Sequence, residues 1–529
     1  MAHVVTWMIF LPLIGAVVCL LVSHAASKWV ALLTTIVTAA LSVLLAFNFY
    51  NGESDAQFVL AVDWISGINV QYRTGVDGLN MPLVLLTTLL SILVVMASWS
   101  IEKATKAYMA LYLFLITGML GVFLSLDLFL FYVFFEISLL PMYFLIGVWG
   151  GPRKEYAAIK FFLYTLFGSI CLLIVMLGLF FFTKEAAGAN GSTWIMAGAG
   201  EGELSLIDPA VRALFASGGP HWEFAQLAFW LTLIAFMVKL PAVPFHTWLP
   251  DAHVEAPTPI SMVLAGVLLK MGGYAMMRIT WPFFPEAAQL FWACAAGLGV
   301  IAIIYGAFCA MAQTDWKRLV AYSSVSHMGY VMLGIAVLNK TAFDGAYYQM
   351  IAHGISSAMM FYLVGVVYER SHHRDLNRLG GIWNKWPGYT GWAMLGFFAG
   401  MGLPGLCGFI GEIMVLLGTF KAAGAGQIGA GDVATVYTLG ILAASGVILT
   451  AGYILWMVQR VYMGKPREDY EGYENIRPIE YGVMLPLGVA AIVFGVVPAL
   501  VFNMTDATFT DLLEIIAPAS DAVMAATDN

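Results

Sequence analysis

Apolar runs of about 20 residues follow one another along almost the whole chain, and this feature limits the fold more than any other. A helix needs roughly 20 mostly apolar residues to cross a bilayer. Only 11% of the 529 residues are charged, whereas soluble globular domains carry about 25%. Lipid-exposed backbone must satisfy its own hydrogen bonds, which favours helices in such runs. We therefore expect an all-α polytopic membrane protein with a single transmembrane domain over residues 1–529.

The hydropathy pattern predicts about fourteen spans. The connection at 184–225 is the longest and is rich in Gly and Ala, so we expect an extracytoplasmic loop there. The tail after residue 504 is short and acidic. No basic segment precedes the first apolar run and no small-residue cleavage site follows it, so this run is interpreted as a span and not as a signal peptide. The spans cover 4–23, 28–50, 79–100, 107–125, 128–149, 157–183, 226–249, 257–279, 286–309, 317–338, 342–369, 390–421, 435–461 and 480–503.

The basic residues orient these spans. With the N-terminus outside the cytoplasm, sixteen of the 24 Lys and Arg residues fall in cytoplasmic connections, and six, including Arg278, fall on the opposite side. Cytoplasmic loops normally carry the excess of Lys and Arg. The bias therefore predicts an even number of spans with both termini outside. The two remaining basic residues, Lys239 and Lys270, lie near the middle of spans.

These two lysines are the first candidates for function. A lysine at the bilayer centre costs about 2.5–3.5 kcal/mol on insertion scales, and such residues usually mark an ion or proton path. Each lies about fourteen residues into its span, which is too deep for the ammonium to reach an interface easily. Apolar surroundings disfavour the charged ammonium, and a nearby carboxylate favours it. A lysine with a moving carboxylate partner can therefore switch its charge, as a proton relay requires.

Four other titratable side chains fall inside predicted spans. Glu136 and Glu412 have apolar neighbours, and a structural bond to a serine or to the backbone is the alternative to a functional role. His327 and His353 lie on adjacent spans among serines. A neutral imidazole can both accept and donate a proton. Two such histidines favour a hydrated relay over two separate packing residues.

Residues near the ends of the spans have a weaker functional signal. His246 and His253 follow Lys239, and structural bonding at a helix end is as consistent with their positions as function is. Asp127, Asp251, Glu255 and Glu369 fall at span ends and are expected to be ordinary surface charges.

Prolines interrupt two predicted spans. Proline removes a backbone donor and clashes with the preceding turn. Pro241 and Pro244 should therefore break the helix directly after Lys239, and Pro404 should break the span that carries Glu412. Carbonyl groups freed at membrane depth are tolerated only where they are buried in protein or line a cavity.

The two breaks also indicate an internal repeat. KLPAVPF at 239–245 and GLPGLCGF at 402–409 lie five spans apart, so their spans run in opposite directions. Broken helices in matching positions of two halves are typical of inverted-repeat transporters. We therefore align the fourth to eighth spans, residues 107–279, with the ninth to thirteenth, residues 286–461.

The segment HTWLPDAHVEAPTPISMVLAGVLLKMGGY at 246–274 resembles the signature of the antiporter-like membrane subunits. These proteins occur in respiratory NADH–quinone oxidoreductase (complex I), in multisubunit sodium/proton antiporters and in membrane-bound hydrogenases. The resemblance covers nearly the whole chain and implies fourteen helices with two inverted five-helix repeats. It also implies a relay that contains Glu136 paired with Lys239, a central Lys270, and then His327 and His353.

Glu412 matches the last relay position of the family. That position is lysine in most paralogues and glutamate in the M-type subunits of bacterial complex I, the counterparts of mitochondrial NADH dehydrogenase subunit 4. The chain also stops 26 residues after its last predicted span, without the long lateral helix of the L-type subunits. The resemblance therefore implies a proton-pumping subunit with no redox site of its own, in the bacterial inner membrane with both termini periplasmic.

The same resemblance implies the partners. They are the other membrane subunits of complex I, including the L- and N-type antiporter-like subunits and the L-type lateral helix, together with lipids and protons but no nucleic acid. FMN, iron–sulfur clusters and quinone are expected in partner subunits, and no cofactor or metal is expected on this chain.

Three alternatives stay open. The first is a sodium/proton antiporter subunit, against which Glu412 argues. The second is a quinone- or nucleotide-binding redox enzyme. GAGQIG at 424–429 matches G-x-G-x-x-G, but it lies between spans without a βαβ unit and is expected to be a flexible loop. The five cysteines show no ligand spacing. The third is a passive scaffold, which would leave two buried lysines unexplained.

Overall fold

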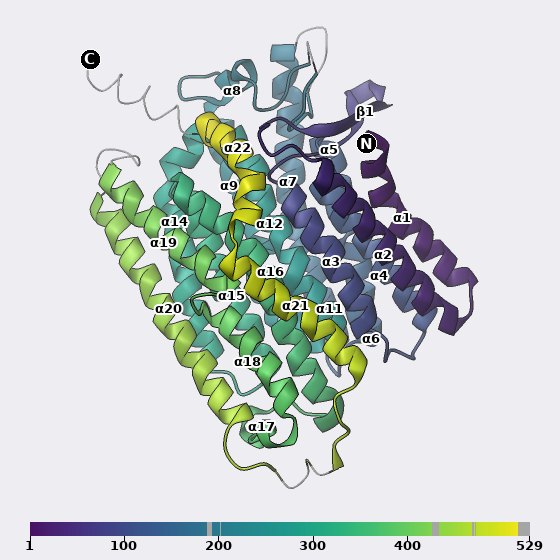
Figure 1. Ribbon diagram of the computed structural model, residues 1–529. Coiled ribbons are helices and arrows are strands. Elements are labelled where there is room, and N and C mark those ends of the chain that lie inside the picture. Colours follow the sequence, from purple (N-terminus) through teal and green to yellow (C-terminus); the bar gives the residue numbers. More distant parts are fainter. Residues whose placement is uncertain (188–192, 201–202, 426–432, 468–469, 471, 517–529) are drawn as a thin grey trace.

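The computed structural model describes every residue except 188–192, 201–202, 426–432, 468–469, 471 and 517–529 (Figure 1). The predicted Gly-rich loop at 424–429 falls mostly outside the described residues. The helices are α1 (Ala2–Leu21), α2 (His24–Asn48), α3 (Met81–Ala97), α4 (Thr105–Leu124), α5 (Leu128–Ile137), α6 (Leu139–Trp149), α7 (Lys154–Ala187), α8 (Pro209–Phe215), α9 (Trp222–Lys239), α10 (Trp248–Glu255), α11 (Thr258–Val263), α12 (Leu269–Ala275), α13 (Trp281–Phe283), α14 (Pro285–Met311), α15 (Trp316–Ala336), α16 (Lys340–Ser371), α17 (Ile382–Lys385), α18 (Pro387–Met401), α19 (Cys407–Ala425), α20 (Val433–Tyr462), α21 (Pro478–Val496) and α22 (Ala499–Ile516).

The expectation of an all-α membrane protein is confirmed. Among the described residues, twelve helices are long and apolar enough to cross a membrane. Helix α3, at the predicted span 79–100, is shorter, and the predicted span 390–421 is divided between α18 and α19. The count of fourteen spans and the pairing of the two repeats therefore stay predictions.

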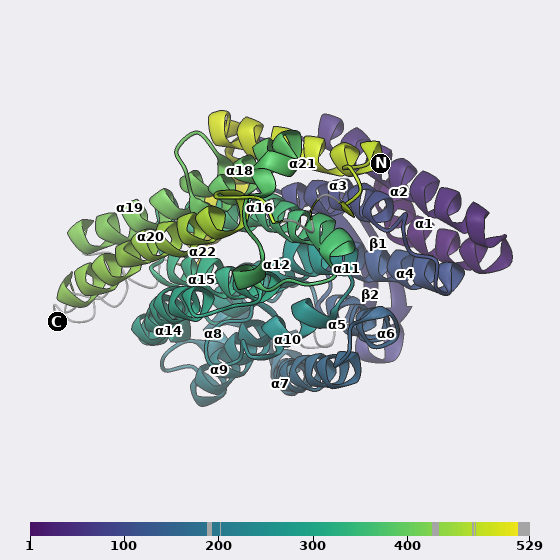
Figure 2. The same cartoon turned by 90° about the horizontal axis from the view of Figure 1, so that it is seen from below.

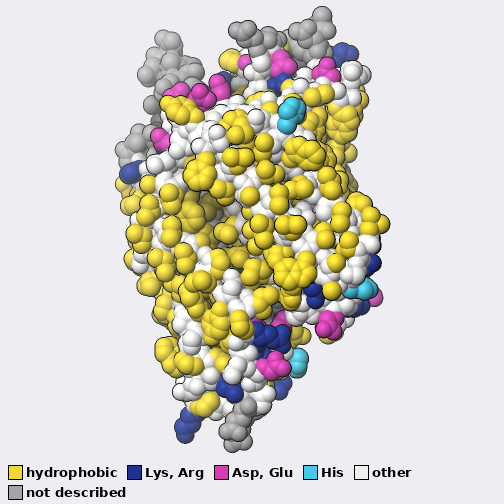
Figure 3. Space-filling model, turned by 45° about the vertical axis from the view of Figure 1, so that its right-hand side comes forward, with side chains coloured by type: hydrophobic (Ala, Val, Ile, Leu, Met, Phe, Trp, Pro, Cys, Tyr) yellow, Lys and Arg dark blue, Asp and Glu magenta, His cyan; other side chains and the backbone are white. Residues whose placement is uncertain are grey.

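The helices form a broad bundle whose interior holds α11, α12, α16 and their neighbours (Figure 2). Helices α1 and α2 lie at one edge, and α19 and α20 lie at the other. The most apolar stretches of Thr258–Phe283 and of α16 are entirely buried. Apolar side chains form a belt on the outside, and charged side chains gather at its two ends (Figure 3). The apolar belt is therefore suited to contact with lipid, whereas Thr258–Phe283 and α16 are shielded from lipid by the surrounding helices.

Two segments at the end that carries α8 were not expected from the sequence. The first is an antiparallel hairpin of β1 (Gln57–Ile65) and β2 (Val70–Val76). Its Arg73 forms an ion pair with Glu203, in the predicted loop at 184–225. Burial by itself would raise the pKa of the Glu203 carboxyl, but the hydrogen bond from the Gly200 amide and the Arg73 charge lower it.

The second segment is α22, which takes up much of the predicted acidic tail. It continues to Ile516, and Phe509 packs on Phe343 and Tyr347 of α16, with ring centroids 5.2 and 5.0 Å apart. Helix α22 ends on the same side of the bundle as the start of α1 (Figure 1). An even number of crossings would produce this arrangement.

Candidate functional site

Lys239 lies where its helix ends. Helix α9 stops at Lys239, two residues before Pro241, and the next helix, α10, begins only at Trp248. The side chain is 2% exposed, and its ammonium has no hydrogen-bond partner among the described residues. The Nζ atom lies 4.7 Å from the centre of the Phe135 ring, which partly compensates the positive charge. An ammonium held this loosely is suited to a change of charge.

Glu136 is the carboxylate that acts electrostatically on Lys239. It lies on α5, next to Phe135 and close to a break at Ser138 that the sequence did not predict. One of its oxygens, Oε1, is buried without a hydrogen-bond partner among the described residues. The two groups therefore interact electrostatically, without a direct bond to the ammonium among the described residues.

Helices α9 and α12 meet tightly beside Lys239 and Lys270. A Cβ atom at Gly272 would lie 2.6 Å from the backbone nitrogen of Leu240 and 2.7 Å from the backbone oxygen of Phe236. Neither backbone atom can move aside as a flexible side chain would. The glycine therefore sets the distance between the helices that carry the two lysines.

We expect Gly272→Ala to destabilise the protein by about 1–3 kcal/mol, because overpacking forces the two helices apart. The measurement is thermal unfolding of the purified complex, followed by scanning fluorimetry. Gly297→Ala is the matched control, since a Cβ atom there would meet nothing within 4 Å. Equal melting temperatures for the two variants would contradict the prediction.

Lys270 is held by its own helix and by a histidine. Its ammonium donates to the backbone oxygen of Ala265 at 2.6 Å and lies 2.6 Å from Nδ1 of His353. Ala265 belongs to η3 (Leu264–Leu268), a π-helical segment, and a second one, η4 (Met276–Thr280), follows α12. A π-helical turn alters the α-helical hydrogen-bond pattern and often occurs at functional sites. Here it provides a backbone acceptor for the lysine.

Three further predicted residues continue from Lys270 toward α19. The rings of His353 on α16 and His327 on α15 have centroids 5.6 Å apart. Nδ1 of His327 lies 2.9 Å from Oε1 of Glu412. We call Lys270, His353, His327 and Glu412 the polar line. All four are buried, and each comes from a different helix.

The hydrogen bonds of the polar line give the two histidines complementary roles. When Lys270 is charged, its ammonium donates a hydrogen bond to Nδ1 of His353, and Nε2 of His353 then carries the hydrogen of the neutral ring. When Glu412 is ionised, Nδ1 of His327 donates to it, and Nε2 is free to accept. Neither Nε2 atom has a hydrogen-bond partner among the described residues. A water molecule or a ring rotation would connect the two rings.

The break between helices α18 and α19 lies next to Glu412, the last residue of the polar line. Helix α18 ends at Met401, and α19 begins at Cys407, with Pro404 in the break. Gly402 has a φ of 80°, and a Cβ atom there would lie 3.0 Å from Oε2 of Glu412. The break therefore brings backbone close to the carboxylate without a side chain between them.

Gln349 is a member of the site that the sequence analysis missed. Its Nε2 atom lies 3.4 Å from Nδ1 of His327 and 3.4 Å from Oε1 of Glu412. It is buried on α16, one turn from His353. A buried amide inside an apolar span was the available signal.

The expectation of surface charges at the span ends was wrong for α10. Asp251 and Glu255 are only 8% and 6% exposed. Asp251 bonds Lys160 at 2.7 Å and contacts Arg318 at 3.4 Å, and Glu255 accepts from the Arg153 amide at 2.9 Å. The broken helix turns α10 back into the protein, so its charges need buried partners. Asp127 is likewise buried, where it caps α5.

Two histidines of the broken helix lie near this charged cluster: His246 is within electrostatic reach of Lys160, and its ring packs on Tyr305 with centroids 5.2 Å apart. The ring nitrogens of His253 have no hydrogen-bond partner within the described part of the chain, so helix-end bonding does not explain this residue. His253 stacks on Phe361 with centroids 4.3 Å apart. It lies within electrostatic reach of both Lys317 and Lys270.

Arg278 also differs from expectation. The sequence placed it at the outer interface, near the end of the predicted span 257–279, but it lies in η4, within the helical stretch Thr258–Phe283, and its side chain is 5% exposed. The arginine can be buried there because Asp77 neutralises its charge.

The sequence matches known families and proteins over most of its length. Residues 125–438 match the family described as NADH:quinone oxidoreductase/Mrp antiporter, transmembrane, and residues 7–127 match the amino terminus of NADH-ubiquinone oxidoreductase chain 4. The chain is 38% identical to NADH-quinone oxidoreductase subunit M of Rhodobacter capsulatus, over 97% of each chain. It is 37% identical to subunit M of Pseudomonas aeruginosa, over 96% of each.

Solved structures have the same fold. A chain of respiratory complex I from Thermus thermophilus superimposes with a TM-score of 0.82 and 26% identity, over 97% of this chain and 99% of that one. A chain of the Mrp complex from Dietzia superimposes with a TM-score of 0.78 at 19% identity, over 98% and 99%. The second likeness concerns the fold alone.

Proposed function

The chain belongs to the NADH:quinone oxidoreductase/Mrp antiporter transmembrane family, and we propose that it is a proton-translocating M-type subunit in the membrane arm of an NADH–quinone oxidoreductase. The observation that carries this proposal is the polar line. Titratable side chains from four helices meet in the apolar interior, where isolated charges are costly. A structural role would require one partner per charge, whereas here each group contacts the next.

In the proposed mechanism, protons enter from the cytoplasmic side. The charged cluster around Asp251 and Glu255 lies at that end, and His253 lies between it and Lys270. A proton on Lys270 would pass to Nδ1 of His353 as Nε2 of His353 releases one toward His327. His327 would then protonate Glu412 through Nδ1. After the transfer, His353 carries its hydrogen on Nδ1 and His327 carries its hydrogen on Nε2. Each histidine would return to its starting tautomer by rotation of its imidazole or by exchange of that proton.

Energy for this transfer must come from outside the chain. Moving one charge against 100 mV requires about 2.3 kcal/mol. In this proposal, partner subunits hold FMN, iron–sulfur clusters and quinone and perform the redox chemistry. Electrostatic change at Glu136 and Lys239 would transmit that energy to the polar line. The L- and N-type subunits and the L-type lateral helix are the proposed neighbours.

The proposed orientation follows from the basic residues. With the positive-inside bias, the end that carries α17 faces the cytoplasm, and the end that carries α8 and α22 faces the periplasm. Basic side chains are visible at the α17 end in Figure 3.

Glu412→Gln tests the proposed relay. Glutamine keeps the shape of the side chain and can still accept from His327, but it cannot take up a proton. We expect NADH-driven acidification of inverted membrane vesicles to fall by about 10²-fold, as is typical when a positioned acid–base group is lost. Assembly is checked on a native gel. The exposed Glu369→Gln is the matched control, and full pumping by an assembled Glu412→Gln complex would refute the relay.

A further inference from the structure

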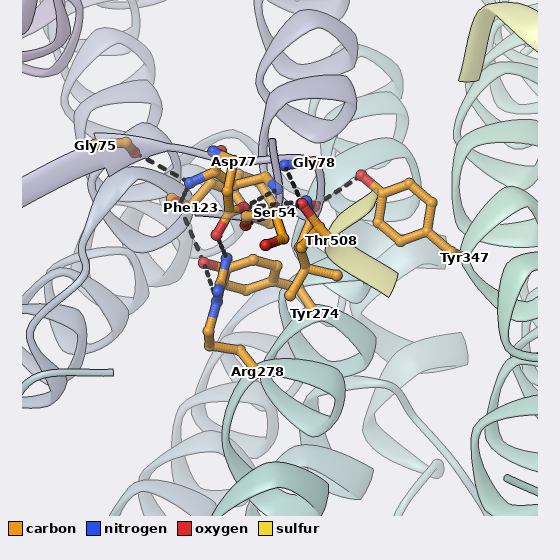
Figure 4. Close-up of polar contacts among 11 residues, drawn as sticks. Ser54, Gly75, Asp77, Gly78, Phe123, Tyr274, Arg278, Tyr347 and Thr508 are labelled. Atoms are coloured by element: carbon orange, nitrogen blue, oxygen red, sulfur yellow. Dashed lines mark hydrogen bonds and ion pairs between the residues drawn. The ribbon is translucent and has the colours of Figure 1, made fainter. Parts of the chain in front are cut away.

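A second buried charge lies on the same helix as Lys270. Arg278 follows it by eight residues, and its Nη2 atom forms an ion pair with Oδ2 of Asp77, at the start of α3 (Figure 4). The side chains are 5% and 2% exposed. The other oxygen of Asp77 accepts from the backbone nitrogens of Leu79 and Asn80 at 3.0 and 3.1 Å. Each of these contacts brings a donor to the carboxylate.

Tyr274 occupies the position between the two cations. Spacing of four residues places Lys270, Tyr274 and Arg278 along one side of the helix. Arg278 Nε donates to the tyrosine oxygen at 3.4 Å, and the tyrosine hydroxyl donates to the backbone oxygen of Phe123 at 3.1 Å. The hydroxyl proton is thus committed to a carbonyl that has no proton to pass on.

The surroundings of the ion pair are closed. A Cβ atom at Gly78 would lie 2.4 Å from the backbone oxygen of Met504, so the segment that leads into α3 touches α22 there. Thr508 of α22 accepts from the Gly78 amide at 3.1 Å, and Tyr347 of α16 donates to Leu79 at 2.7 Å. The segment that leads into α3, together with α16 and α22, therefore converges on the ion pair, whose side chains have little access to solvent.

The two directions away from Lys270 differ in their chemistry. Sideways, it meets His353, His327 and Glu412, which all exchange protons. Outward along its own helix, it meets a committed hydroxyl and then a guanidinium. Arginine stays protonated in proteins, so it cannot relay a proton, and its positive charge opposes the approach of another. Arginine excludes protons from some channels in this way.

We propose that Asp77, Tyr274 and Arg278 form an electrostatic plug that closes the outward path from Lys270 and directs its proton sideways to His353. This inference rests on the proposed function, because it takes Lys270 to carry a proton. Asp77 neutralises Arg278 and so allows the plug to lie in the apolar interior, where an unpaired guanidinium would be strongly unfavourable. Arg278 is a positioning residue and does not itself take part in the transfer.

The test measures passive proton leak in the absence of NADH. The whole complex is reconstituted into liposomes with an entrapped pH dye, and the decay of an imposed pH gradient is followed. The double variant Arg278→Met with Asp77→Asn removes both charges, and its leak is expected to rise several-fold over wild type. Arg278→Gln, which can still donate to Asp77, gives the same test if the double variant does not assemble.

Two further variants separate a plug from general damage. Arg278→Lys retains a positive charge, so its passive proton leak should be as low as that of the wild-type complex. Adding Lys270→Met to the leaking variant should abolish the leak, because the path then lacks its inner proton site. An unchanged leak in an assembled Arg278→Gln complex, or a leak that persists with Lys270→Met, would overturn the plug. Failure of the wild-type complex to pump with NADH would instead refute the proposed function.

Discussion

A complex that carries Lys239→Ala is expected to assemble and yet to lose NADH-driven proton pumping, together with the quinone reduction coupled to it. Lys239 stands at the end of α9, and no hydrogen bond from the described part of the chain fixes the charge of its ammonium. Removing it deletes the cation on which the Glu136 carboxylate acts and, in the proposed mechanism, interrupts the transmission of energy to the polar line. We expect a loss of about 10²–10⁴-fold, the range found for positioned proton-transfer groups.

The measurement combines two readings on inverted membrane vesicles, with assembly confirmed on a native gel. NADH oxidation and the resulting pH gradient are followed together. Lys239→Arg sharpens the test, because arginine keeps the charge but does not release its proton, so it should be inactive too. Exposed Lys421→Ala is the matched control and should pump normally. Normal pumping by Lys239→Ala would remove this residue from the mechanism, and a sodium-dependent proton exchange lost without any effect on NADH oxidation would favour an antiporter.

Arg370→Met is expected to destabilise the protein by about 3–5 kcal/mol, because it leaves a buried carboxylate without its partner. Arg370, at the end of α16, forms two bonds to Glu480 of α21, at 2.8 and 2.7 Å, and their side chains are 4% and 6% exposed. It also donates to the backbone oxygens of Glu474 and Asn475. The arginine therefore joins α16, α21 and the segment between α20 and α21.

Thermal unfolding of the purified complex measures this effect. The double variant Arg370→Met with Glu480→Leu is the control, since replacing both members of a buried pair by apolar residues is often neutral. It should recover most of the lost stability. Equal losses in the single and double variants would show that the uncompensated carboxylate is not the cause.

The sequence was most informative where a residue conflicts with its surroundings. Lys239, Lys270, His327, His353 and Glu412 stand out because a polar group in an apolar span is costly, so its presence needs a reason. The break after Lys239 could be predicted for the same kind of reason, since proline cannot continue a helix. These conflicts are local and can be recognised without knowing the fold.

Features that depend on distant partners could not be predicted. Arg278 was expected at the outer interface because the partner that allows its burial, Asp77, is 201 residues away in sequence. Asp251 seemed exposed because nothing local shows that α10 turns back toward Lys160. Gln349 became recognisable only beside His327 and Glu412. In each case, burial is decided by a neighbour from another helix.

The polar line runs from helix to helix, and this has a consequence for how the membrane voltage acts. Lys270, His353 and His327 each lie near the middle of a long helical stretch, so a proton that moves among them stays at nearly the same depth. The electric field does work on a charge only as it changes depth. In the proposed relay, the sideways steps would therefore proceed almost unaffected by the voltage. The work against the voltage would be done where the proton enters and where it leaves.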